Sequence, residues 1–317
     1  MKKILVTRKL LKTNEERISK LWEAKLNLND EIYSPDKLIE MSNDCDAILS
    51  SITDNIDDKV INKLSKKVKI ISNFAVGYGN IDIRAAQKKN IVVTNTPDVL
   101  TEATAEIAML LILGACRRAT EGIRAVRNKN WKWSADFLIG KQLYGSRLGI
   151  LGMGRIGRAV AKRAESFGMK IHYHNRSKLN SDLENGAIYH KNIKSLFSNS
   201  DILSINCPST DETKKIINKK TLEYFPKGAV ITNSARGEII DDDAMVEALK
   251  SKRIYALGLD VYNGEPEIHP GYLSQAEVFV LPHLGSATEK TRTDMANLAI
   301  NNIEEFFKKG ICVNKVN

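Results

Sequence analysis

The sequence predicts an α/β protein with two domains, each built on a parallel sheet. Short apolar runs that indicate strands alternate with helical patterns along most of the 317 residues, and this order is typical of parallel sheets. Most of these runs are apolar throughout, as strands covered on both faces are. A glycine-rich turn joins one such run to a helix in the middle of the chain, after a first region that has strands of its own.

The first region contains several short candidate strands and ends near residue 99. Its third strand is followed by AVGYGNID, a loop just beyond a strand end, where ligands of open α/β sheets bind. The backbone N–H groups of Val76 and Gly77 would suit a small carboxylate there, although an ordinary glycine-rich turn is an equal alternative. The predicted elements are strands at Lys3 to Thr7, Asp46 to Ser50, Val68 to Phe74 and Ile91 to Thr94, and a helix over Glu15 to Trp22.

A long apolar helical pattern follows from Thr101 to Val126. Its composition favours burial between domains or between subunits. The next segment, RNKNWKWS, places Trp131 and Trp133 in a polar loop, where they mark an interface or a pocket rim or cover the edge of a core.

The stretch RLGILGMGRIGRAVAKRAESFGMKIHYH, from Arg147 to His174, has the pattern strand, helix, strand. Its first turn carries the spacing G-x-G-x-x-G. Gly152 permits a tight turn, Gly154 lets a pyrophosphate approach the backbone, and Gly157 lets helix and strand pack closely. The N–H groups and dipole at the start of the helix suit phosphates. Glycine-rich turns are common, but the flanking strands supply the required context, so we predict a Rossmann-like, dinucleotide-binding domain.

The pattern of buried strands continues after His174. Further strands are predicted at Ala187 to Tyr189, Asp201 to Cys207, Ala229 to Asn233, Ala256 to Val261 and Val278 to Pro282, and helices at Thr221 to Phe225, Asp242 to Lys250 and Ala287 to Lys309.

Composition excludes several classes of protein. With 43% hydrophobic and 27% charged residues, the chain is of ordinary globular composition. The net charge of +10 comes from lysines spread along the chain, which favours a solvated surface over a nucleic-acid site. No apolar run is long enough for a membrane span. The four scattered cysteines have neither metal nor disulfide spacing, so we expect no metal and a cytoplasmic setting.

The segment HYHNRSK bears on the choice of cofactor. An acidic residue near the end of the second strand would bind the ribose 2′-OH of NAD, but Asn175 stands at that position. Arg176, Ser177 and Lys178 follow and would bind a 2′-phosphate by charge-assisted hydrogen bonds. We therefore expect NADP(H) in preference to NAD(H). A solvated basic turn is the alternative interpretation.

Three segments at predicted carboxyl ends of strands carry a coherent set of reactive groups: NSARG, GLDVYNGEP and LPHLGSAT. Arg236 would bind the carboxylate and carbonyl oxygens of a 2-oxo acid. His283 would donate a proton to the carbonyl oxygen as hydride arrives at carbon. Glu265 would hydrogen-bond the other imidazole nitrogen, orient the ring and favour its protonated form.

With these motifs, the chain resembles the D-isomer-specific 2-hydroxyacid dehydrogenases over nearly its whole length. The resemblance extends to FAVGYGNID, NTPDVLTEATAE, LGMGRIGRAVAKRA, NCPSTDETKKIIN and FPKGAVITNSARGEIIDDDAMVEAL. It implies Arg236, Glu265 and His283 as the catalytic set, and substrate-carboxylate contacts at Val76 and Gly77. Beyond the glycine turn and residues 175–177, it implies cofactor contacts at Thr104, Arg155, Ile156, Cys207, Pro208, Thr213, Ser234, Ala235, Arg236, Asp260, His283 and Gly285.

The resemblance also implies a fold and an assembly. A flavodoxin-like substrate-binding domain would comprise residues 1–99 and 287–317, with the dinucleotide-binding domain, 100–286, inserted and the active site in a cleft. A homodimer built on the cofactor domains would account for the apolar helix from Thr101. Within the family, the glyoxylate and hydroxypyruvate reductases are the most similar, because their basic residues after the second strand match Arg176.

Two further hypotheses stay open. One is an NAD-dependent dehydrogenase for D-lactate or a bulkier 2-hydroxy acid, because the sequence does not define the shape of the side-chain pocket. The other is a cofactor-sensing interaction protein, since transcriptional corepressors share this fold. The complete set of Arg236, Glu265 and His283 favours an enzyme.

Overall fold

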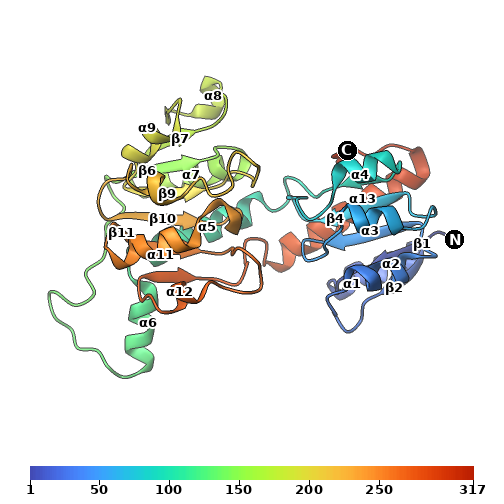
Figure 1. The fold of residues 1–317 in the computed structure, drawn as a ribbon, viewed down its shortest axis with the longest axis horizontal. Helices are drawn as coiled ribbons and strands as arrows, with labels where there is room; N and C mark the ends of the chain where they lie inside the picture. Colours follow the sequence, from blue (N-terminus) through green and yellow to red (C-terminus); the bar gives the residue numbers. More distant parts are fainter. The chain divides into compact units, whose positions relative to one another are not determined.

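A computed structural model describes all residues, 1–317. The chain forms two compact units, one of Met1–Leu100 with Ala287–Asn317 and the other of Thr101–Ser286 (Figure 1). Each unit has its own parallel sheet and its own buried core. The predicted α/β class with two parallel-sheet domains is thereby confirmed. No helix has both the length and the apolar character needed to cross a membrane.

The first unit is a five-stranded parallel sheet in the order β2-β1-β3-β4-β5. The strand β3 is buried at all five positions, as expected for a central strand covered on both faces. One core lies under α2, α3 and α4, and a second lies under α1 and α13. The strands are β1 (Lys3–Val6), β2 (Glu23–Leu26), β3 (Ala47–Ser51), β4 (Ile70–Phe74) and β5 (Val92–Thr94), and the helices are α1 (Lys12–Leu21), α2 (Pro35–Ser42), α3 (Asp58–Lys63), α4 (Ile83–Lys88) and α13 (Glu289–Lys309).

The second unit is a seven-stranded parallel sheet in the order β12-β11-β10-β9-β6-β7-β8. The chain enters at β6 and builds first toward β7 and β8, then returns to β9 on the other side of β6. Sheets with such a reversal bind ligands at the carboxyl ends of the two strands beside it, which are β6 and β9 here. The strands are β6 (Arg147–Leu151), β7 (Lys170–His174), β8 (Ile188–Tyr189), β9 (Ile202–Ile205), β10 (Ala229–Asn233), β11 (Ile254–Leu259) and β12 (Val278–Val280).

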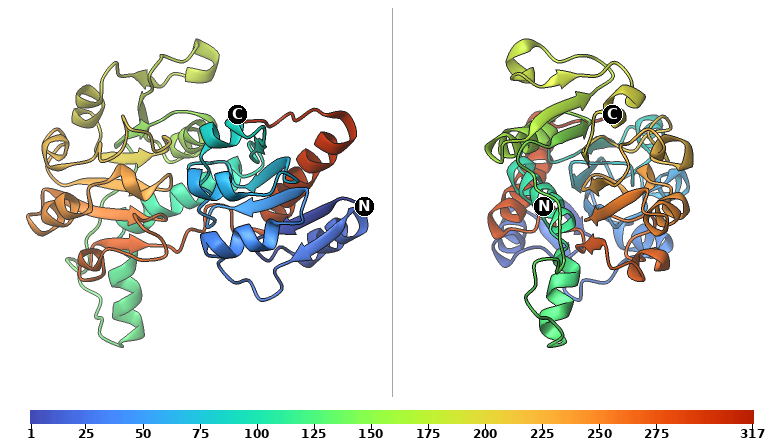
Figure 2. Two further views of the ribbon diagram at one scale, coloured as in Figure 1. Left: turned by 45° about the vertical axis from the view of Figure 1, so that its right-hand side comes forward. Right: turned by 90° about the vertical axis from the view of Figure 1, so that its left-hand side faces the viewer.

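Helices cover both faces of the seven-stranded sheet (Figure 2). One core forms around α5 and α7, and the other forms around α9 to α12. The helices of this unit are α5 (Thr101–Cys116), α6 (Ala119–Arg127), α7 (Arg155–Ser166), α8 (Ser181–Glu184), α9 (Ile193–Ser198), α10 (Lys219–Leu222), α11 (Asp242–Lys250), α12 (Pro270–Leu273) and a 3₁₀ turn at Gly237–Ile239.

The prediction of one helix from Thr101 to Val126 is wrong. The helix breaks at Arg118, which has φ 55° in the left-handed region, so α5 and α6 are separate. The apolar character of α5 has a reason within its own unit, because this helix packs on α7, β10 and β11. Burial between domains or subunits is not needed to explain it.

The helix α6 and the loop after it extend away from the sheet of their unit (Figure 1). No residue of α6 is buried. We call this segment, residues 119–139, the arm. Its exposed apolar side chains include Ile123, Val126, Trp131 and Trp133, and the last of these is 81% exposed.

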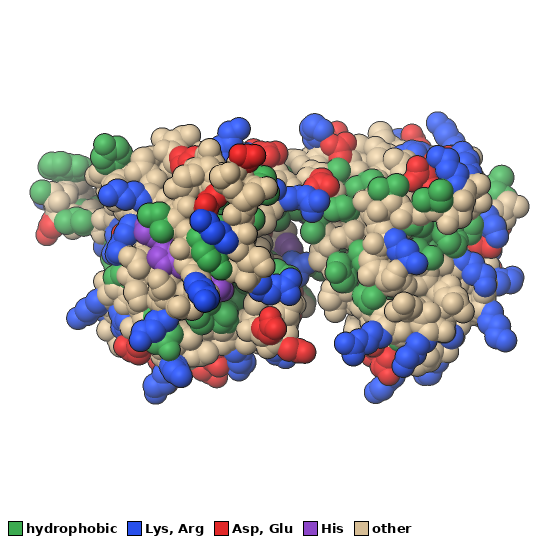
Figure 3. Space-filling model, turned by 90° about the horizontal axis from the view of Figure 1, so that it is seen from above, with side chains coloured by type: hydrophobic (Ala, Val, Ile, Leu, Met, Phe, Trp, Pro, Cys, Tyr) green, Lys and Arg blue, Asp and Glu red, His purple; other side chains and the backbone are tan.

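Basic side chains are scattered over the face in Figure 3, among acidic and neutral ones. Such a distribution is typical of a solvated surface.

Candidate active site

The glycine turn after β6 has the geometry that a dinucleotide needs. Gly152 has φ +93°, and a Cβ there would lie 2.6 Å from the backbone nitrogen of Cys207. A Cβ at Gly157 would lie 2.5 Å from the carbonyl oxygen of Gly152. By contrast, nothing lies within 4 Å of a Cβ position at Gly154, which caps α7 without any side-chain hydrogen bond. The open helix N-terminus therefore fits a pyrophosphate.

Asn175, at the end of β7, has a structural task in this turn. Its side-chain Oδ1 accepts a hydrogen bond from the Met153 backbone N–H (2.6 Å), and its Nδ2 donates to the Met153 carbonyl (3.4 Å). The side chain thus fixes the middle residue of the GMG turn. Arg176 and Ser177 are exposed beside it, and Lys178 pairs with Glu184 at 3.4 Å.

The loops after β10 and β11 are in unusually close contact. A Cβ at Gly237 would lie 2.0 Å from the Tyr262 carbonyl carbon, so only glycine allows this approach. Asn233 stabilises the first loop from within, because its Nδ2 donates to the Arg236 carbonyl (2.8 Å) and its Oδ1 accepts from the Ala235 N–H (2.9 Å). The approach brings Arg236 into the neighbourhood of Glu265.

Arg236 is half-buried, and burial lowers the pKa of its guanidinium, while the charges of Glu238 and Glu265 act against this shift. Its guanidinium makes one hydrogen bond within the protein, from Nη1 to the carbonyl of Ala235 (2.6 Å). The Nε and Nη2 donors are therefore open to a ligand. A partly desolvated guanidinium with open donors is suited to a carboxylate.

His283 and Glu265 form a hydrogen-bonded pair, with 2.6 Å between His283 Nδ1 and Glu265 Oε2. The other carboxylate oxygen accepts the backbone N–H of Tyr262 (2.9 Å). Burial by itself would raise the pKa of Glu265, but the hydrogen bond and charge of His283 outweigh it, and the pKa is lowered. Glu265 is thus an ionised acceptor that fixes the ring, and Nε2 has no hydrogen-bond partner within the protein.

The backbone at His283 is itself held in place. His283 has φ 54°, a left-handed conformation that non-glycine residues rarely adopt. On one side, the Tyr262 hydroxyl donates to the carbonyl of Leu281 (2.6 Å). On the other, the Asp260 carboxylate accepts the N–H groups of Leu284 (2.6 Å) and Gly285 (2.8 Å). The surrounding hydrogen bonds therefore impose the strained conformation.

The structure brings the predicted catalytic residues and cofactor contacts into one unit. Val76 and Gly77 lie in the other unit, in the loop after β4. The remaining predicted cofactor contacts lie in the first turn of α5 (Thr104), in the segment after β9 (Cys207, Pro208, Thr213), after β10 (Ser234, Ala235) and after β11 and β12 (Asp260, Gly285).

Several residues that shape the site are not indicated by the sequence pattern. Asn233, Gly237 and Tyr262 lie inside quoted motifs, but their partners are residues distant in the chain or backbone atoms of the loop itself. The sequence motifs alone do not indicate these contacts. Thr104 and Thr213 also use their hydroxyl groups within the protein, on the carbonyls of Gly285 (3.0 Å) and Pro208 (2.7 Å).

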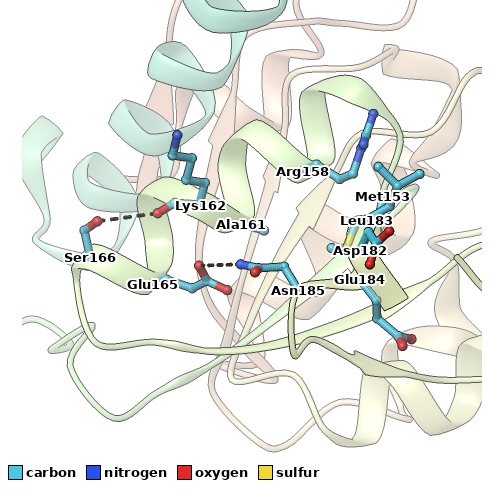
Figure 4. Close-up of a pocket in the computed structure, with 10 residues that line it drawn as sticks. All are labelled: Met153, Arg158, Ala161, Lys162, Glu165, Ser166, Asp182, Leu183, Glu184 and Asn185. Carbon is cyan, nitrogen blue, oxygen red and sulfur yellow. Dashed lines mark hydrogen bonds between the residues drawn. The ribbon is translucent and has the colours of Figure 1, made fainter. Parts of the chain in front are cut away.

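A hollow of about 700 Å³ lies between α7 and α8 (Figure 4). Its wall carries both basic and acidic side chains, and the Glu165 carboxylate accepts a hydrogen bond from Asn185 across it (3.4 Å). It shares only Met153 with the glycine turn and none of the catalytic set. Its lining residues are Met153, Arg158, Ala161, Lys162, Glu165, Ser166, Asp182, Leu183, Glu184 and Asn185.

An uncapped glycine turn at the point where the strand order reverses, in one unit with a guanidinium and a carboxylate-bound imidazole, is typical of a nicotinamide-dependent dehydrogenase. A model of the D-isomer specific 2-hydroxyacid dehydrogenase NAD binding domain matches residues 109–285. The chain belongs to this family, as its sequence motifs predicted.

Comparisons over the full length agree. The chain is 38% identical to a glycerate dehydrogenase of Hyphomicrobium methylovorum, with 96% of each protein covered. It is 39% identical to a glyoxylate reductase of Thermococcus litoralis, covering 99% of this chain and 96% of the relative. Among solved structures, it resembles an NADPH-dependent glyoxylate/hydroxypyruvate reductase from Sinorhizobium meliloti, in complex with NADP and malonate. The TM-score is 0.89 at 31% identity, with 99% and 96% of the two chains covered.

We predict that Asp260→Asn disturbs the His283 loop. The asparagine side chain keeps one oxygen that accepts a backbone N–H. Its NH₂ group replaces the other oxygen, so it faces a second backbone N–H donor and cannot accept from it. A buried donor without a partner costs roughly 1–3 kcal/mol of unfolding free energy, which chemical denaturation measures. Displacement of the imidazole by about 1 Å would lower turnover by up to about 10²-fold. The exposed Asp211→Asn is the control, and equal behaviour of the two variants would contradict the assignment.

Proposed function

We propose that the chain reduces a small 2-oxo acid, glyoxylate or hydroxypyruvate, to the D-2-hydroxy acid with NADPH. The observation that carries the proposal is the joint presence of Arg236 and the Glu265–His283 pair in one unit with the uncapped glycine turn. The relatives support the substrate class, because two are a glyoxylate reductase and a glycerate dehydrogenase. Glycerate is the product of hydroxypyruvate reduction.

In this mechanism, Arg236 binds the carboxylate and the carbonyl oxygen of the substrate through its open donors. A nicotinamide cofactor held at the glycine turn would supply the hydride for the carbonyl carbon. His283 transfers a proton from Nε2 to the carbonyl oxygen, so the C=O group becomes CH–OH and the imidazole is left neutral. Glu265 remains ionised throughout and holds Nδ1, so that Nε2 alone faces the substrate.

The two parts of the chain would have different tasks. Residues 100–286 would bind the dinucleotide, through the glycine turn and the other predicted contacts. Residues 1–99 with 287–317 would bind the substrate, through the backbone N–H groups of Val76 and Gly77. These N–H groups donate to no acceptor in the protein, which supports a role in binding a carboxylate.

Removal of the proton donor tests the mechanism. We expect His283→Ala to lower kcat with glyoxylate and hydroxypyruvate by roughly 10²–10⁴-fold, the usual effect of losing a general acid. The dissociation constant for NADPH, measured by fluorescence titration, should change far less. His269→Ala, a histidine of the same unit outside the set, is the matched control. An unchanged kcat in His283→Ala would remove this residue from the mechanism.

The preference for NADP(H) has two supports in the structure. Asn175 places no carboxylate at the end of β7 to repel a 2′-phosphate, and its amide is committed to Met153. Arg176 is exposed next to it, as a phosphate ligand must be. Among the similar structures, the reductase from Sinorhizobium meliloti is named as NADPH-dependent.

We predict that Arg176→Ala lowers the ratio of kcat/KM for NADPH to that for NADH. Loss of a charge-assisted hydrogen bond, worth about 1.5–3 kcal/mol, corresponds to roughly 10–100-fold. Lys227→Ala, an exposed basic residue of the same unit, should leave the ratio unchanged. A clear preference of the wild-type protein for NADH would refute the assignment.

We also propose a homodimer in which the arm is covered by a second copy. Exposed apolar side chains crowd this segment, with Val126 at 59% and Trp131 at 55% exposed. Such patches mark association surfaces.

Sedimentation equilibrium should therefore give twice the chain mass of 35.4 kDa. A double substitution, Val126→Glu with Trp133→Glu, should shift the protein to monomer, because it places charge on the patch that the second copy would cover. Val313→Glu, at an equally exposed apolar residue of the other unit, should not. A wild-type monomer at micromolar concentration would contradict the proposal.

A further inference from the structure

The loop after β4 is held by hydrogen bonds to three successive carbonyl oxygens. The backbone N–H of Thr96 donates to the carbonyl of Ala75 (2.9 Å). The side-chain amide of Asn95 donates to Val76 (2.8 Å), and that of Asn73 donates to Gly77 (3.1 Å). All three donors belong to strand ends of the same sheet, β4 and β5.

This anchoring determines which way the N–H groups of the loop face. In a trans peptide the C=O and N–H bonds point in opposite directions. Carbonyls drawn toward Thr96, Asn95 and Asn73 therefore turn the N–H groups of residues 76, 77 and 78 away from these anchors. None of the three N–H groups donates to an acceptor in the protein. Successive N–H groups on one side of a loop form a concavity that suits an anion.

Asn95 is in turn fixed by the C-terminal segment. It is 9% exposed, its carbonyl accepts from the Asn302 side chain (3.1 Å), and its N–H donates to the carbonyl of Asn314 (3.2 Å). The Asn302 Oδ1 accepts from the Asn314 side chain (2.9 Å), which closes the network. The Val316 N–H also donates to the carbonyl of Val93 (2.9 Å), so the C-terminal segment pairs along the edge strand β5.

Asn73 has a similar support. Its Oδ1 accepts from the Ser50 hydroxyl (3.1 Å), and its Nδ2 also reaches Asn80 Oδ1 (3.1 Å). Asn80 in turn donates to the carbonyls of Ser51 (2.9 Å) and Asp54 (3.0 Å). The amides of Asn73 and Asn80 therefore have their orientation set by partners on both the oxygen and the nitrogen.

We propose that Asn73 and Asn95 are positioning residues for substrate binding. Their amides hold the carbonyls of Val76 and Gly77, so that the N–H groups of the same two peptide units, those of Gly77 and Tyr78, are presented to the substrate carboxylate. The Val76 N–H is oriented in the same way by the bond from Thr96 to the Ala75 carbonyl. Asn302 and Asn314 stabilise this arrangement by fixing Asn95. The inference rests on the proposed function, because it concerns the same carboxylate.

The test is a steady-state comparison of Asn73→Ala, Asn95→Ala and Asn302→Ala with the wild-type protein. Loss of the amide lets the loop peptides rotate, so KM for glyoxylate should rise about tenfold or more in the first two variants. The effect should be smaller in Asn302→Ala, which leaves the Asn95 amide in place. Because the carboxylate is held in both ground and transition states, kcat at saturation should change much less than KM. Inhibition by oxalate should weaken in parallel, and the NADPH dissociation constant should stay constant.

Asn27→Ala is the matched control. This buried asparagine bonds the carbonyls of Thr7 (2.7 Å) and Glu31 (2.7 Å) at another strand end of the same unit. It should lose comparable thermal stability without a change in KM. Equal KM values in Asn27→Ala, Asn73→Ala and Asn95→Ala would overturn the inference. If the Asn95 or Asn73 variant does not fold, Asn302→Ala decides, because an unchanged KM there refutes the support by the C-terminal segment. A wild-type protein inactive on all 2-oxo acids would instead overturn the proposed function.

Discussion

The site depends on one buried carboxylate, that of Asp260. Its side chain has no exposed surface, and burial raises its pKa, while the N–H groups of Leu284 and Gly285 act in the opposite direction. A buried carboxylate is costly unless it is hydrogen-bonded. The same two bonds that make Asp260 tolerable fix the turn after β12, and they help to keep His283 at φ 54°. One pair of hydrogen bonds thus offsets both the strained backbone at His283 and the desolvation of the Asp260 carboxylate.

Sheet topology explains why the loops after β10, β11 and β12 all contribute to the site. The strands β10, β11 and β12 are parallel neighbours, so their carboxyl ends open at one edge. Arg236, Asp260 with Glu265, and His283 follow these three strands in order. Gly237 removes the side chain that would hold the first two loops apart, and the Tyr262 hydroxyl links the second to the third. The reactive groups converge because adjacent parallel strands deliver them, and the fine spacing comes from a missing Cβ and a phenol.

Much of this could be predicted from the sequence. Apolar runs and the glycine spacing indicated both sheets, and residues placed after successive buried strands had to share an edge. What could not be predicted were effects of single residues. Arg118 in a left-handed conformation divides a helix that periodicity alone predicts as continuous. Asn175 stands where a ribose-binding residue is expected, at the end of the second strand of the glycine-turn unit. Its amide is instead bound to Met153, a contact that no local pattern indicates. Short elements such as β2 and α8 lack enough buried residues to produce a readable pattern.

The two features to which we assign anion binding follow a common physical rule. At the glycine turn, the helix geometry of α7 leaves its first N–H groups without intrahelical partners. In the loop after β4, N–H groups are left without partners for another reason. Asparagine amides donate to the carbonyls of this loop, and the N–H groups of the same peptide units therefore face away from them. Asparagine suits this task because one uncharged group both donates and accepts, so it can hold a peptide unit without placing a competing charge near the ligand. A lysine or arginine at these positions would attract the carboxylate to itself. The neutral amides thus leave an anion to the N–H groups of the backbone.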